Sequence, residues 1–74
     1  METVLVEFTS VNKYGKERFL VSLQDICLLG ETKNGCCVMI NDGNVYDCAN
    51  VYDDVKKLLS ASGITVIYLP VPAM

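Results

Sequence analysis

A chain of 74 residues allows one small domain, so we expect a single domain over residues 1–74. Its formal net charge is −3 at pH 7, with six Lys and Arg residues against nine Asp and Glu residues. This balance disfavours nucleic-acid binding, because proteins that bind nucleic acids usually present a basic face to the phosphates. The composition is 51% hydrophobic, yet no apolar run approaches the ~20 residues that cross a bilayer.

The N-terminal stretch METVLVEFTS has neither the basic start nor the continuous apolar run of a signal peptide. We therefore expect a cytoplasmic protein with no membrane contact. Within the stretch, Thr3–Thr9 carries β-branched and aromatic side chains at alternate positions, which predicts a first strand. Asn and Gly in Asn12–Lys16 tolerate the positive φ of a tight turn, so Phe19–Ser22 is expected to return as a second strand.

A meander of further short strands is predicted after a bend at Leu23–Asp25. Ile26–Glu31 resumes an extended pattern, and the Asn-Gly pair of Thr32–Gly35 is a strong hairpin signal. The last hairpin consists of the strand Cys36–Ile40, a turn at Asn41-Asp42-Gly43 and the strand Asn44–Cys48. The sequence therefore predicts a mostly antiparallel β-meander of five to six short strands.

The register of that last hairpin depends on its turn. A type I turn over Asn41-Asp42-Gly43 with a glycine bulge places Cys36 opposite Cys48. A two-residue type I′ turn at Asp42-Gly43 places Cys37 there instead, and both registers remain open at this point.

The four cysteines do not form a pattern typical of a catalytic or metal-binding site. The chain has no His and no C-x-x-C pair, and neighbouring strand residues such as Cys36 and Cys37 point to opposite faces. In the reducing cytosol we expect them to be small buried hydrophobic residues. We therefore predict no catalytic residue, no metal and no cofactor. A thiol redox or metal-binding protein is the least favoured alternative.

The hydrophobic period changes from two to 3.6 near residue 51. Val51, Val55, Leu58 and Leu59 share one face of a predicted helix at about 51–61. Asn50 is expected to be its N-cap, with Asp53 bonding back to it. Gly63 occupies the position of a left-handed C-cap residue.

A final strand is predicted at about 64–69, ended by Pro70. Both of its faces are apolar, and one short helix covers only a narrow stripe of a sheet. A small domain also has a thin core. We therefore expect a homo-oligomer, with a dimer as the first expectation. The predicted contact residues are Ile64, Val66, Ile67, Tyr68 and Leu69.

The order of these elements resembles the FlbD-type small proteins linked to flagellar and swarming motility. The shared elements are a G-K-x-[FY] strand entry, one residue longer here (Gly15–Phe19), an apolar bend (Leu23–Ile26), a V-x-[IL]-x-[DN]-G hairpin (Val38–Gly43) and a helix (Tyr52–Leu59). The resemblance implies a small α+β domain with a regulatory or accessory role rather than catalysis. A bacterial protein and one from a phage or mobile element both fit the sequence.

The same elements are more distantly similar to the C-terminal half of LytTR-type DNA-binding domains. Asp42, Asn44 and Asp47 occupy the hairpin where basic residues would contact DNA. The alternative function is therefore a LytTR-like nucleic-acid-binding module that uses the only basic cluster, in which an aromatic ring among cations can stack on a base. Its contact residues would be Lys13, Tyr14, Lys16 and Arg18. The favoured function is a non-enzymatic binding or accessory protein that acts through protein–protein contacts and self-association.

Overall fold

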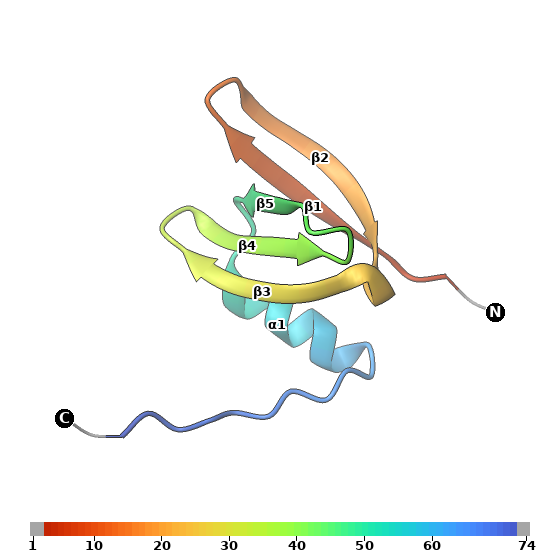
Figure 1. The fold of residues 1–74 in the computed structure, drawn as a ribbon, viewed down its shortest axis with the longest axis vertical. Coiled ribbons are helices and arrows are strands. Elements are labelled where there is room, and N and C mark those ends of the chain that lie inside the picture. Colours follow the sequence, from red (N-terminus) through yellow and green to blue (C-terminus); the bar gives the residue numbers. More distant parts are fainter. Residues whose placement is uncertain (1–2, 73–74) are drawn as a thin grey trace.

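Over the described residues 3–72 the fold consists of five antiparallel strands and one α-helix (Figure 1). The structure, a computed structural model, describes residues 3–72, so residues 1, 2, 73 and 74 of the expected domain lie outside the described range. The elements are β1 (Leu5–Asn12), β2 (Gly15–Ser22), the 3-10 turn η1 (Leu23–Asp25), β3 (Ile26–Thr32), β4 (Gly35–Ile40), β5 (Val45–Cys48) and α1 (Tyr52–Ala61). The predicted small α+β fold, its bend at Leu23–Asp25 and its C-terminal helix are confirmed.

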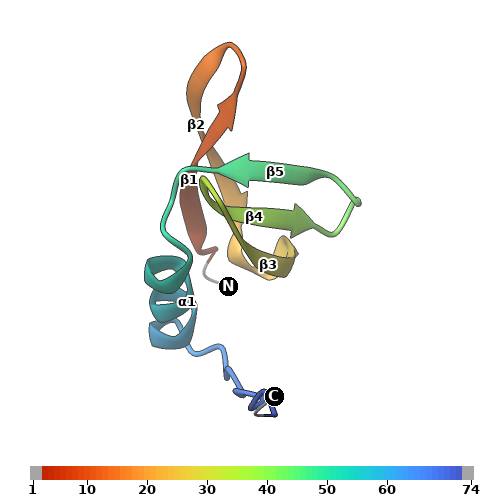
Figure 2. The same cartoon turned by 90° about the vertical axis from the view of Figure 1, so that its left-hand side faces the viewer.

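The strand order is β2-β1-β5-β4-β3, which leaves β2 and β3 at the two edges. Each hairpin pairs consecutive strands, but the sheet is joined in the middle by β1 and β5, which are far apart in the chain. Ser10 lies opposite Cys48 there, and the Ala49 N–H donates to the Thr9 carbonyl at 2.9 Å. The β1–β2 hairpin rises at a steep angle to β3–β5, so the sheet curls around its apolar face (Figure 2).

One hydrophobic core fills the inside of this curl. Phe8 and Phe19 face each other across β1 and β2 and stack at a centroid distance of 5.7 Å, and Tyr46 lies 4.9 Å from Phe19. Helix α1 contributes Val55 and Leu59. The buried core residues are Val6, Phe8, Val21, Cys36, Val38, Cys48, Val55 and Leu59.

The β4–β5 turn settles the cysteine register. The Gly43 N–H donates to the Ile40 carbonyl at 2.9 Å and Gly43 has a φ of 92°, the geometry of a type I turn followed by a glycine bulge. Cys36 consequently lies directly opposite Cys48, while Cys37 pairs with Asp47.

The predicted cap of α1 is only half correct. Gly63 has the expected positive φ, 95°, just after the helix. Asn50 is not the N-cap: the helix is preceded by Val51, and no side-chain hydrogen bond caps it. The Asn50 side-chain oxygen instead accepts the backbone N–H of Thr9 at 2.8 Å, so a long-range contact to β1 has taken the acceptor that the helix would use.

The predicted final strand at 64–69 is wrong for the single chain. Residues 64–72 have no regular secondary structure, and the sheet has five strands. A strand needs a neighbour that completes its hydrogen bonds. The segment follows α1 after only Ser62 and Gly63 and runs past the helix, apart from every strand (Figures 1 and 2).

Candidate functional site

The segment of residues 64–72, which we call the C-terminal segment, leaves many apolar side chains open to solvent. Its exposed large hydrophobic residues are Ile64, Val66, Ile67, Tyr68, Leu69 and Val71. Ile67 and Leu69 are each 80% exposed and Tyr68 is 72% exposed. The Ile64 N–H donates to the Leu59 carbonyl at 3.2 Å, but no backbone hydrogen bond ties residues 65–72 to the rest of the described chain, residues 3–72. The segment therefore offers both apolar side chains and unpaired backbone groups.

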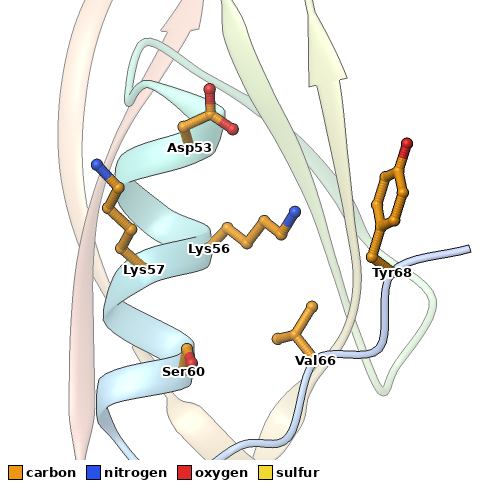
Figure 3. A pocket seen from close by; sticks show the side chains of 6 residues that line it. All are labelled: Asp53, Lys56, Lys57, Ser60, Val66 and Tyr68. Carbon is orange, nitrogen blue, oxygen red and sulfur yellow. The ribbon is translucent and has the colours of Figure 1, made fainter. Parts of the chain in front are cut away.

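A groove of about 430 Å³ separates the C-terminal segment from α1. In Figure 3 the side chains of Val66 and Tyr68 rise from the segment on the side of the groove, and Lys56 extends from the helix toward them. The other lining residues are Asp53, Lys57 and Ser60. The alternation of an extended chain directs Ile67 and Leu69 to the opposite side, in agreement with their high exposure.

All five predicted contact residues therefore lie together on this segment. Ile64 and Val66 are partly covered, at 39% and 44% exposure, Ile67 and Leu69 are almost free, and Tyr68 lines the groove but is still mostly exposed. The segment thus has two faces, one toward the groove and one toward solvent. A partner can cover the solvent face without displacing the chain from α1.

A second open surface is the edge strand β3, which sequence reasoning missed. Cys27 and Leu28 are exposed on it, and the Cys27 thiol donates only to the Met39 carbonyl at 3.4 Å. Its stretch Ile26–Gly30 carries no charge. The uncharged run ICLLG was a visible signal, but only the strand order shows that this run forms a free edge.

The residues of the basic alternative are only partly brought together. Lys13 and Tyr14 form the tip of the β1–β2 hairpin, with the ammonium 5.1 Å from the ring centroid and the ring 84% exposed. Arg18 lies further along β2 and faces Glu7 at 3.8 Å, an exposed pair of small energetic value. Lys16 lies between them on β2, opposite Val11.

The cysteines divide into a buried pair and two more accessible thiols. Cys36 and Cys48 are fully buried, Cys37 is half-buried and Cys27 is exposed. Burial, with the nearby Cys36 and Asp47, raises the pKa of the Cys48 thiol to about 12, and burial likewise raises the pKa of Cys36. Both thiols therefore stay protonated at neutral pH, which makes them poor nucleophiles.

Residues 3–72 contain no group of three His, Cys, Asp or Glu side chains placed to hold a metal ion. In the same range no helix is long and apolar enough to cross a membrane. Comparisons with protein-family models, with curated proteins and with solved structures found no match to this chain.

Proposed function

We propose that this chain is a small non-enzymatic binding protein that acts through self-association and protein–protein contacts, in a regulatory or accessory role in the cytoplasm. The observation that carries the proposal is the exposed, uncharged C-terminal segment. The resemblance of the sequence to FlbD-type proteins points toward the same kind of role.

The solvent face of the segment supplies apolar surface that a partner can bury. Soluble monomers keep contiguous apolar surface small, and an exposed patch of this kind usually marks an interaction site. Complete burial of an Ile or Leu side chain stabilises by about 1.5–3 kcal/mol. Ile67 and Leu69 are both 80% exposed, so covering them in each of two copies offers a substantial driving force for a homodimer.

The test is the mass of the protein in solution. We expect light scattering of the full chain to give twice the 8.2 kDa chain mass, falling to that of a monomer in Ile67→Lys. Val45→Lys is the matched control, because Val45 is 61% exposed on β5, away from the segment, and it should stay dimeric. Far-UV circular dichroism checks that both variants are folded. A folded wild-type monomer at high protein concentration would refute the proposal.

A further inference from the structure

We propose that residues 64–69 of one copy add as a sixth strand to the free edge of β3 in a second copy, and that the exchange is reciprocal. This inference rests on the proposed function and specifies its contact.

The two outer strands of the sheet, β2 and β3, differ in charge. Because β1 and β5 pair only at Ser10 and Cys48, short stretches of both strands also lack a neighbour on that side, but each carries an acidic residue, Glu7 or Asp47. The strand order leaves β2 and β3 unpaired on their outer sides. The β2 edge carries three consecutive charges, Lys16, Glu17 and Arg18, and charges on an edge strand oppose the addition of another strand. The β3 edge has no charge from Ile26 to Gly30, although its pairing with β4 shifts register between Ile26 and Leu28 and Glu31 follows. Its uncharged stretch makes it the better of the two outer edges for the addition of a strand.

The segment matches that edge in length and in chemistry. Ile64–Leu69 has six residues and β3 has seven, and four of the six, Ile64 to Ile67, are β-branched types favoured in strands. The segment has no charge, and Pro70, which cannot donate to a ladder, marks its end. Main-chain hydrogen bonds along an edge are a common way to bind an extended peptide.

Unpaired backbone groups on both sides favour the pairing. Residues 65–72 make no backbone hydrogen bond within the described range, and an edge strand presents every second N–H and C=O to solvent. The chain's own segment lies apart from its β3 (Figures 1 and 2). Each copy thus carries one donor segment and one acceptor edge, and a two-fold exchange satisfies both and closes at two copies.

The first test compares two exposed leucines on the two edge strands. Leu28 on β3 is 46% exposed and Leu20 on β2 is 61% exposed, so a lysine at either position should leave the core intact. We expect Leu28→Lys to raise the dimer dissociation constant about tenfold or more and Leu20→Lys to leave it within about threefold. Analytical ultracentrifugation measures both, with circular dichroism as the check on folding.

The second test uses Cys27 as a native reporter on the β3 edge. Val66→Cys and Ile67→Cys place a new thiol on either face of the segment, and oxidised glutathione should convert at least one of them to a covalent dimer of twice the chain mass. Adding Cys27→Ser should abolish this covalent dimer although Cys37 is still present. That result would identify Cys27 as the partner of the new cysteine.

The outcomes separate this inference from the proposed function. A wild-type monomer overturns both. If Ile67→Lys dissociates the dimer but Leu28→Lys does not, only the β3 contact is overturned. The same holds if Leu20→Lys, and not Leu28→Lys, dissociates it. A disulfide formed within one 8.2 kDa chain overturns the exchange between copies, and a mass that grows with concentration without a plateau overturns the closed pair.

Discussion

The substitution Gly35→Ala tests how the end of β5 is held against the start of β4. Gly35 is the first residue of β4 and has a φ of 149°. A Cβ built there would lie 2.5 Å from the Asn50 carbonyl oxygen, 2.7 Å from the Cys48 carbonyl oxygen and 2.8 Å from the Ala49 carbonyl carbon. All three are backbone atoms, so no side-chain rotation relieves the contact.

The chain between β5 and α1, which the new methyl group would contact, is also held by hydrogen bonds to β1. Ala49 donates to the Thr9 carbonyl at 2.9 Å, and Asn50 accepts the Thr9 N–H at 2.8 Å. Displacing the connection would therefore strain the junction at which β5 meets β1. For Gly35→Ala we expect the free energy of unfolding to fall by about 1–2 kcal/mol because of the unfavourable backbone conformation. Crowding of the new methyl group against the backbone should lower it by about 1–3 kcal/mol more.

Gly15→Ala is the matched control. Gly15 also has a positive φ, 124°, but nothing lies within 4 Å of its Cβ position. We expect the free energy of unfolding of Gly15→Ala to fall only by the cost of the backbone conformation, about 1–2 kcal/mol. In Gly35→Ala it should fall by about 2–5 kcal/mol, because crowding is added. The entropic gain of replacing Gly by Ala in the unfolded chain is shared and cancels in the difference.

Urea unfolding followed by far-UV circular dichroism measures both losses, at one protein concentration because self-association would add to stability. A core of this size supplies only about 3–5 kcal/mol, so Gly35→Ala should unfold at a much lower urea concentration than Gly15→Ala. Equal losses in the two variants would refute the reasoning, since they would mean that the β5–α1 connection moves aside without cost.

Three further outcomes are expected. Because the folded state raises the pKa of Cys48 from 9.0 to about 12, it keeps a proton that the unfolded chain loses. The free energy of unfolding should therefore not depend on this thiol below pH 9 and should fall as the pH rises toward 12. In Cys48→Ala this fall should be shallower. An equal slope in both proteins would contradict the raised pKa of Cys48. Intact-mass measurement of protein from a reducing cytosol should find four reduced cysteines and no stoichiometric metal, whereas bound zinc or a two-proton deficit would give the thiols a chemical role. Mobility-shift assays near physiological ionic strength should show no salt-sensitive DNA or RNA binding at micromolar protein; a shift that disappears in Lys13→Glu/Lys16→Glu would favour the basic alternative instead.

Local features of the fold were predictable because local chemistry decides them. Positive-φ glycines mark the turns and the end of α1, and the change of hydrophobic period marks the helix. The β4–β5 turn left two registers open because both turn types accept the same residues, and the Gly43 hydrogen bond to Ile40 decided between them.

Long-range features were not predictable from single segments. The pairing of β1 with β5 joins residues about 40 positions apart, and no local pattern encodes it. The same junction explains the wrong cap, because Thr9 competes for the Asn50 side chain from a strand 41 residues away. The free β3 edge follows from this strand order, so the sequence alone could not single it out.

The failed strand prediction at 64–69 has a different cause. Alternating apolar side chains show that a segment suits a sheet, but they do not show which chain supplies its neighbour. Within the described residues 3–72 the segment pairs with no strand and leaves Ile67 and Leu69 in solvent. A segment with strand composition, no charge and no partner in its own fold is the kind of element that an added copy completes. The pattern that misled the assignment within one chain is therefore the reason to seek its neighbour on the β3 edge of another.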